Sequence, residues 1–342
     1  MKAGVGLSIA WEIFYEKINT VLKDTLDKDI IIFGSNPGGE FIKWFYEYFY
    51  QKKVVAIVDR WNSDNHYLVH HLMALYYLWS EKTVIINTLP ENIGPEVEFN
   101  AIGEVWERTN WKKKQIIPLH REIFGENGKD RYITFFDWLE EEYALDILTS
   151  IRRCDVKGKE GHGYYPTDFR MIFDTLSNEL FDKDTAIMDF GCGKGAAMMT
   201  LGSCGFRKVG GIEYTDSIYH SMCTNLETLG CRLEKCTAQT VHENGLNEDG
   251  FYCYLGDAAD LQEELDHYHN FYLFNPFSYM LTAKVISNIL DSLKRKPRRI
   301  MIFYAEPICH QLLIDSGYFK LLKEIGCGMG GITYQANIYE SM

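Results

Sequence analysis

Runs of apolar residues with strand length alternate with helical patterns along the first 90 residues. Apolar positions spaced as on one helix face predict a helix over 6–27, and an aromatic-rich segment predicts another over 40–51. Continuous apolar runs at 29–33, 53–58 and 83–87 predict strands of the kind that is buried on both faces of a parallel sheet. Leucines at 68, 72, 75 and 78 predict a helix over 66–80.

The second half of the chain has a more regular rhythm. Five apolar runs alternate with helical patterns, and two further runs follow that are joined by a glycine-rich link. This order predicts an α/β fold whose C-terminal part is a seven-stranded, doubly wound sheet with an antiparallel edge hairpin. The expected strands are 185–190, 208–213, 251–256, 271–275, 299–304, 319–324 and 332–339, and the expected helices are 167–180, 194–204, 216–229, 258–265 and 280–293.

Three parts are expected along the 342 residues, a length that favours about two domains. Residues 1–130 are predicted to form a smaller α/β domain. Residues 131–163 are predicted to be a helical connection followed by a linker, because 155–163 is rich in Lys, Gly and Glu. Residues 164–342 are predicted to form the main domain.

Composition narrows the class of protein. The formal net charge is −13, which argues against a nucleic acid as partner, because binding the phosphate backbone usually needs a basic face. No apolar run approaches the roughly 18 residues of a membrane span, so no membrane association is expected. Nine cysteines without a C-x-x-C pair indicate reduced thiols and a cytoplasmic location.

Two clusters in the first half have plain structural interpretations. His66 and His70, with Asp64, have the spacing of metal ligands, but their segment is otherwise apolar, and we expect no metal site. The aromatic helix is expected to fill the core and to form a domain or subunit interface, such as that of a homodimer. Its aromatic residues are Trp44, Phe45, Tyr46, Tyr48, Phe49 and Tyr50.

The strongest chemical signal is the turn Asp189-Phe-Gly-Cys-Gly-Lys-Gly195, which follows a predicted strand. Glycines there let the backbone turn sharply and approach a ligand. Glu213 ends the next strand, where a carboxylate can accept both hydroxyls of a ribose, and Asp257 ends the third, where it can accept the exocyclic amine of adenine. Each acid also has a structural interpretation: Asp189 as a turn cap, Glu213 as an exposed strand-end acid and Asp257 as a helix N-cap.

With these residues, roughly 160–342 resembles a class I S-adenosylmethionine-dependent methyltransferase. The resemblance implies S-adenosyl-L-methionine as the cofactor, with Asp189 holding its ammonium and Glu213 its ribose. It also implies that Asp257 and Ala258 bracket adenine. The backbone of Gly191, Cys192 and Gly193 would flank the methionyl part, and Tyr165 and Thr167 resemble the segment that closes over the methionine carboxylate.

The acceptor side is suggested by Asn275-Pro-Phe277, which ends the fourth strand. It resembles the ending seen in amino-directed methyltransferases, where the amide oxygen accepts a hydrogen bond from the target amine and the ring stacks on a flat group. The single proline departs from the adenine-N6 pattern, and the ending is most similar to that of a family of bacterial methyltransferases. Phe277 could instead lie in the core, and Glu306 is the candidate base after the fifth strand.

The implied function is methyl transfer to an amino or hydroxyl group of a small molecule, such as a sugar or an amino-acid derivative. A protein lysine methyltransferase, a non-catalytic nucleotide-binding scaffold and an NAD(P) oxidoreductase are the alternatives. The turn Gly34-Ser-Asn-Pro-Gly-Gly39 with Asp59 resembles a Rossmann-like unit, but its glycines follow G-x-x-x-G-G. We therefore expect an accessory domain that is structural, presents the substrate or binds a nucleotide itself.

Overall fold

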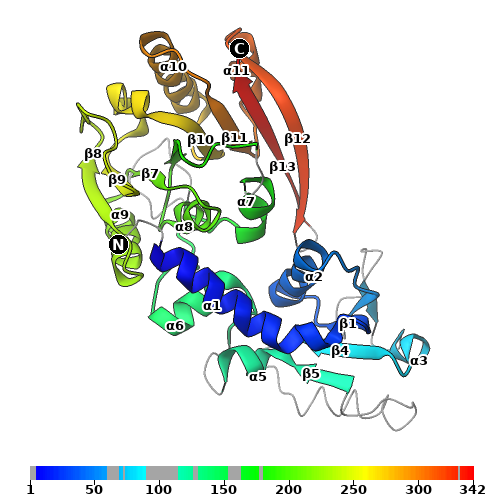
Figure 1. Cartoon of the computed structure of the whole chain (residues 1–342). Helices are drawn as coiled ribbons and strands as arrows, with labels where there is room; N and C mark the ends of the chain where they lie inside the picture. The colour runs from blue at the N-terminus through cyan, green and yellow to red at the C-terminus, as the bar shows by residue number, and fades with distance from the viewer. Residues whose placement is uncertain are drawn as a thin grey trace. The chain divides into compact units, whose positions relative to one another are not determined.

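A computed structural model describes residues 5–59, 69–71, 74–89, 115–125, 130–152, 163–176, 180–329 and 332–342 (Figure 1). They form two compact units. The larger comprises Met1–Ala10, Leu145–Gly328 and Thr333–Met342, and the smaller comprises Trp11–Ala144 and Met329–Ile332. Helix α1 (Val5–Leu22) therefore contributes to both units. Of the histidine cluster considered above, Asp64 and His66 lie outside the described residues.

The smaller unit contains a five-stranded parallel sheet in the order β3-β2-β1-β4-β5. Its strands are β1 (Asp29–Phe33), β2 (Ala56–Asp59), β3 (Val69–His71), β4 (Thr83–Asn87) and β5 (Ile116–Pro118). Its other helices are η1 (Lys23–Thr25), α2 (Pro37–Phe49), α3 (Leu75–Leu78), α5 (Leu119–Phe124) and α6 (Phe135–Tyr143). The prediction of one helix over 66–80 is wrong, because Val69–His71 pairs with β2 as a strand, and α3 spans Leu75–Leu78 among the residues described there.

Helix α2 begins three residues before its predicted start. Asn36 caps it by accepting a hydrogen bond from the Gly39 amide at 2.9 Å, and Pro37 occupies the first turn, where its missing N–H costs nothing. The predicted strand at 53–58 begins later, at Ala56. The Asp59 carboxylate at the end of β2 accepts from the Ser35 amide at 2.7 Å and from the Ser35 hydroxyl at 3.0 Å, so this acid already holds the turn after β1.

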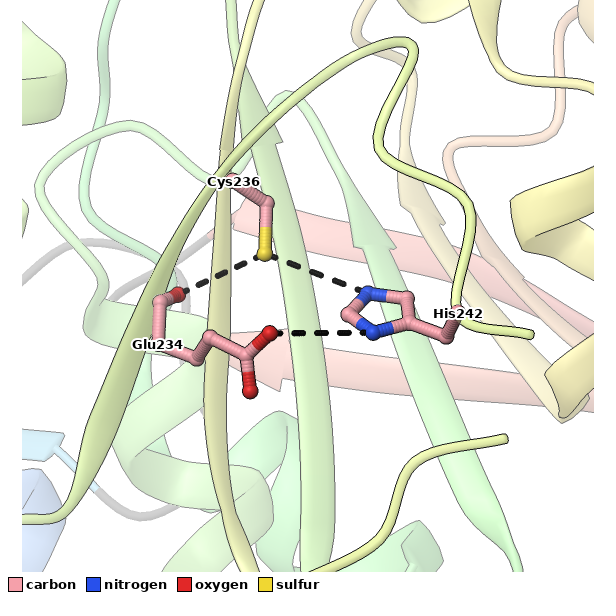
Figure 2. A group of neighbouring side chains, drawn as sticks. All are labelled: Glu234, Cys236 and His242. Atoms are coloured by element: carbon pink, nitrogen blue, oxygen red, sulfur yellow. Dashed lines mark hydrogen bonds and ion pairs between the residues drawn. The ribbon is translucent and has the colours of Figure 1, made fainter. Parts of the chain in front are cut away.

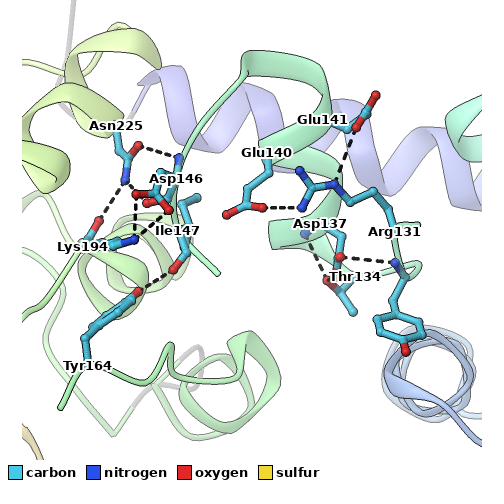
Figure 3. A network of polar contacts seen from close by, with 11 residues as sticks. Arg131, Thr134, Asp137, Glu140, Glu141, Asp146, Ile147, Tyr164, Lys194 and Asn225 are labelled. Carbon is cyan, nitrogen blue, oxygen red and sulfur yellow. Dashed lines mark hydrogen bonds and ion pairs between the residues drawn. The ribbon is translucent and has the colours of Figure 1, made fainter. Parts of the chain in front are cut away.

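Aromatic side chains build much of the core of the smaller unit. The Phe45 and Phe49 ring centroids lie 4.8 Å apart, and Phe14 stacks on Trp138 at 5.3 Å. Near these rings Thr134 caps the start of α6: its hydroxyl accepts from the Asp137 amide and hydrogen-bonds to the Asp137 carboxylate (Figure 3). Burial raises the pKa of Asp137 to about 6. The aromatic helix thus packs within its own unit, and its use as a subunit interface stays a prediction.

The larger unit contains an eight-stranded sheet in the order β12-β13-β11-β10-β6-β7-β9-β8. The expected number of seven is wrong by one edge strand, β8, which pairs in parallel with β9. The two strands of the expected edge hairpin, β12 and β13, are neighbours at the edge of the sheet, and β13 runs antiparallel to β11. The strands are β6 (Ala186–Phe190), β7 (Lys208–Glu213), β8 (Leu233–Thr237), β9 (Gly250–Leu255), β10 (Tyr268–Phe274), β11 (Met301–Ala305), β12 (Phe319–Met329) and β13 (Ile332–Ser341).

Helices cover both faces of this sheet. Met188, Phe271 and Ile302 belong to a cluster that buries the sheet against the helices α10 and α11 and the short turns η6 and η7. On the opposite face, helices α7, α8 and α9 pack, with Met198 of α8 against Gly211 of β7. The bounds are α7 (Phe169–Leu176), α8 (Ala196–Ser203), α9 (Asp216–Thr228), η6 (Ala258–Asp260), η7 (Glu263–His267), α10 (Tyr279–Arg295) and α11 (His310–Asp315).

The strand order reverses at the centre of this sheet. From β6 the chain builds β7 and β9 on one side, and then returns to add β10 and β11 on the other side. In open α/β sheets, ligands bind beyond the carboxyl ends of the strands at such a switch point. The loops that follow β6 and β10 are therefore the place to look for a site.

Two further observations concern membrane-spanning helices and cysteines. Within the described part of the chain, no helix combines the length and the hydropathy of a membrane-crossing segment. Seven cysteines in that part of the chain are buried and form no disulfide bond: Cys192, Cys204, Cys223, Cys231, Cys236, Cys253 and Cys309.

Candidate functional site

The loop after β6 contains three glycines with left-handed backbones, and two of them lie in close contact with other loops. Gly191 and Gly193 have φ of +75° and +56°, a backbone region that other residues rarely adopt. A Cβ on Gly191 would lie 2.8 Å from Cβ of Pro276 in the loop after β10, and a Cβ on Gly193 would lie 2.2 Å from the Tyr164 ring. The two loops at the switch point are thus in close contact, and an aromatic ring covers the middle of the glycine turn.

Asp189 is the most unusual side chain of this region. It lies in β6, is only 2% exposed, and its Oδ2 has no hydrogen-bond partner among the described residues. Burial, and then the charge of Glu213, raise the pKa of its carboxyl well above the ordinary value. A buried carboxylate oxygen without a donor is costly, so this atom is suited to receive a donor from a ligand.

Glu213, the last residue of β7, ties the glycine turn to the next loop. Its Oε2 accepts from the Gly193 amide at 3.2 Å and its Oε1 accepts from the Thr215 amide at 2.7 Å. Burial raises the pKa of this carboxyl, while the backbone donors oppose the rise. A carboxylate has about four acceptor positions, so two amides leave capacity for the hydroxyls of a ligand.

Asp257 follows β9 and caps the short turn η6. Its Oδ1 accepts from the Ala259 amide at 2.9 Å, which confirms the N-cap interpretation. Ala258 beside it is 5% exposed. Since β6, β7 and β9 are neighbouring parallel strands, Asp189, Glu213 and Asp257 follow one another along the same edge of the sheet.

The residues expected on the acceptor side lie at the ends of two adjacent strands. Phe274 of β10 pairs with Ala305 of β11, so Asn275 and Glu306 are the next residues on neighbouring strands. Both have left-handed backbones, with φ of +36° and +48°. Such conformations cost free energy and often occur at functional sites. Phe277 is half-buried and packs against the core, as its structural interpretation expects, and its stacking on an acceptor group stays a prediction.

The remaining predicted residues occupy different environments. Cys192 is 4% exposed, its thiol contacts the Met222 sulfur at 3.3 Å, and burial raises its pKa well above the ordinary value. It therefore fills space rather than acting as a nucleophile. Tyr165 is 66% exposed and Thr167 is 6% exposed, and both follow the ring that covers Gly193.

A polar network that was not expected holds the glycine turn (Figure 3). The Lys194 ammonium lies 2.7 Å from both carboxylate oxygens of Asp146. Asn225 of α9 donates to the carbonyls of Asp146 and Lys194, at 3.0 and 3.2 Å, and Tyr164 donates to the carbonyl of Ile147 at 2.8 Å. Only the unusual lysine within the glycine turn signalled this network in the sequence, because its partners lie far away along the chain.

The arrangement offers carboxylate and amide oxygens, which suit a ligand that carries hydroxyls and a positive charge. Acidic side chains lie at the carboxyl ends of β6, β7 and β9, around a turn of close-packed glycines. The loops after β10 and β11 add an amide and a carboxylic acid on the other side of the switch point. The structure thus brings Asp189 and Glu213 to the glycine turn and places Asn275 beside Glu306.

Comparisons with known proteins give matches to solved structures. No protein-family model and no curated protein matches the sequence significantly. The B. subtilis M1A22 tRNA methyltransferase TrmK matches with a TM-score of 0.37 and 15% identity, over 50% of this chain and 65% of TrmK. P. horikoshii TYW2, solved in complex with MeSAdo, matches with a TM-score of 0.35 and 12% identity, over 50% of this chain and 62% of TYW2. Sp1610 of Streptococcus pneumoniae matches with a TM-score of 0.36 and 17% identity, over 49% of this chain and 68% of that one. The matched part spans about two thirds of each of these chains, and at such TM-scores it assigns neither activity nor substrate.

Proposed function

We propose that this chain is an S-adenosylmethionine-dependent methyltransferase. The observation that carries the proposal is the buried Asp189 carboxylate, whose Oδ2 has no partner among the described residues, beside a glycine turn at the switch point of the sheet. An ammonium group is the ligand chemistry that such an oxygen favours, since it supplies both a donor and a compensating charge.

The other residues of the edge fit the rest of that cofactor. Glu213 retains acceptor capacity for the hydroxyls of a ribose after binding two backbone amides. Asp257 and Ala258 lie after the third strand of the edge, where an acceptor and a small apolar side chain suit adenine. The backbone of Gly191, Cys192 and Gly193 would lie along the methionyl part.

Bound S-adenosylmethionine supplies an activated methyl group, and the protein must align the acceptor for an in-line displacement. Asn275 would orient an acceptor amine through its amide oxygen, and the Phe277 ring would lie against a flat acceptor group. A hydroxyl acceptor would need a base, and Glu306, the residue after the neighbouring strand β11, is our candidate for it. Tyr165 and Thr167 would close over the amino-acid end of the cofactor.

We propose a small molecule with an amino or hydroxyl group, such as a sugar or an amino-acid derivative, as the methyl acceptor. The net charge of −13 favours this over a nucleic acid, because phosphate neutralisation usually requires a basic surface. The left-handed backbones of Asn275 and Glu306 support an acceptor site at the ends of β10 and β11.

The first experiment is a calorimetric titration of the full chain with S-adenosylhomocysteine and, separately, with NAD. Binding of S-adenosylhomocysteine is the expected result, and binding of NAD alone would overturn the proposal. Incubation with methyl-labelled cofactor and a cell extract then tests the acceptor class: label should enter the small-molecule fraction, and label found only in protein or nucleic acid would refute that class.

The Asn275→Ala variant separates the acceptor side from the cofactor side. We expect kcat to fall about 10–100-fold through poorer orientation, with nearly unchanged affinity for S-adenosylhomocysteine. Equal losses of turnover and of cofactor affinity would assign Asn275 to the cofactor instead.

A further inference from the structure

Three potential metal ligands meet at the edge of the larger sheet, on β8 and the loop that follows it (Figure 2). Glu234 and Cys236 are two residues apart on β8 and therefore point to the same side of the strand. His242 reaches back from the loop. Its Nε2 lies 3.9 Å from the Cys236 sulfur, and its Nδ1 lies 3.7 Å from Oε1 of Glu234.

Each separation, measured from a different nitrogen of the His242 ring, is within about 0.3 Å of the distance between two ligands of a tetrahedral zinc site. With ordinary zinc–ligand bond lengths, the sulfur and nitrogen ligands lie about 3.6 Å apart and the nitrogen and oxygen ligands about 3.4 Å. One ligand atom from each residue can be chosen so that all three lie within 4.8 Å of one another. A metal takes only one ring nitrogen, so binding would contract this set by about 1 Å.

The burial of the three groups suits a metal with one open position. Cys236 is 5% exposed and the His242 side chain 8%, whereas the Glu234 side chain is 43% exposed. The thiol and the imidazole thus lie inside, and water can reach the carboxylate side. Sites with three protein ligands usually complete their coordination with water.

The surroundings hold the histidine ring in place. The Tyr254 hydroxyl lies 2.9 Å from His242 Nε2, and the rings of Tyr252 and His267 pack against His242 nearly edge-on, at 5.5 and 6.2 Å. Without a nearby cation, burial raises the pKa of the Cys236 thiol to about 12, helped by the charge of Glu234. A metal ion reverses this preference, since the ligand is the thiolate.

We propose that Glu234, Cys236 and His242 bind one zinc ion, with water as the fourth ligand. A thiolate, an imidazole and a carboxylate are the mixed, borderline-soft set that zinc prefers. Binding forms bonds to sulfur, nitrogen and oxygen, releases the thiol proton to solvent and changes no oxidation state. The ion would fasten the edge strand β8 to its following loop, which buries few apolar side chains of its own. This site is independent of the proposed methyl transfer.

The test uses the full chain freed of metal with a chelator and titrated with Co²⁺, followed by Zn²⁺. We expect one equivalent of Co²⁺ to bind with a thiolate-to-cobalt charge-transfer band that Zn²⁺ removes. The Cys236→Ser variant should lose the band. Glu234→Gln, at a half-exposed position that should not disturb folding, should weaken zinc binding at least about tenfold.

Cys231→Ser is the matched control. Cys231 is also buried, burial likewise raises the pKa of its thiol to about 12, and it lies outside the cluster, so the band should persist in this variant. Absence of the band in the unmodified protein overturns the proposal. So does a band that survives Cys236→Ser, or zinc affinity that is unchanged in Glu234→Gln.

Discussion

The ion pair beneath the glycine turn should respond very differently to the loss of each partner. The Lys194 side chain is 4% exposed, whereas that of Asp146 is 51% exposed, and the ammonium lies 2.7 Å from both carboxylate oxygens. Asp146→Ala leaves a buried ammonium without its counter-charge. Removing one partner of a buried pair costs about 3–5 kcal/mol, and we expect about 3 kcal/mol because water can enter from the Asp146 side.

Lys194→Met removes the ammonium but keeps a side chain of similar length. The half-exposed Asp146 carboxylate then returns to water, so the expected loss is about 1 kcal/mol or less. Asp146→Asn is the intermediate control, because its amide oxygen still accepts from the ammonium. The backbone hydrogen bonds of Asp146 with Asn225 are unaffected by all three changes.

Urea-induced unfolding, followed by circular dichroism, measures these losses as shifts of the midpoint at unchanged slope. Asp146→Ala should be destabilised by about 2 kcal/mol more than Lys194→Met. Equal losses in the two variants, or a larger loss in Lys194→Met, would refute the reasoning that the burial of the cation sets the cost.

Three further predictions concern the cofactor side. Asp257→Ala should weaken binding of S-adenosylhomocysteine by about 1–3 kcal/mol in calorimetry while the circular dichroism spectrum stays unchanged; unaltered affinity would exclude the adenine role. Because burial raises the pKa of Asp189 in the folded state, its ionisation opposes folding, and the stabilising protonated form is lost as pH rises through that pKa. Asp189→Asn should therefore gain stability relative to the unmodified chain as the pH rises above about 4 in urea unfolding, and a constant difference would contradict this. Gly193→Ala should lower the free energy of unfolding by at least about 2 kcal/mol, because of the left-handed backbone and the clash with Tyr164. Gly230→Ala should lower it by only about 1 kcal/mol, because Gly230 has φ of +67° and open space around it. Equal losses would show that the Tyr164 ring does not matter.

Much of the larger sheet could be predicted from the sequence because its strands are buried on both faces. Runs such as Ile187–Phe190 and Phe271–Phe274 are apolar almost throughout, and such runs are typical of strands in a parallel sheet. Strand β8 escaped prediction because, of Leu233–Thr237, only Cys236 is buried, and it owes its conformation to pairing with β9. The short strand β3 was obscured by leucine spacing typical of a helix.

The candidate site likewise contains residues that the sequence could reveal and contacts that it could not. Asp189, Glu213 and Asp257 could be found because a strand end is a local property of the sequence. The contact of Lys194 with Asp146 joins residues 48 apart, and that of Asn225 with Asp146 joins residues 79 apart. No local pattern reports such pairs, since they depend on how the segment around Leu145 folds back against the glycine turn.

The interleaving of the two units constrains how the chain can be dissected. The larger unit takes its first residues from the start of α1, and Met329–Ile332 belong to the smaller unit. Leu7, fully buried, would be missing from a fragment that begins at Leu145, and Gly202 of α8 would lose this neighbour. A single cut in the chain therefore releases neither unit complete. A fragment that holds the whole larger unit would require a circular permutant, in which the first turn of α1 is joined to the eight-stranded sheet.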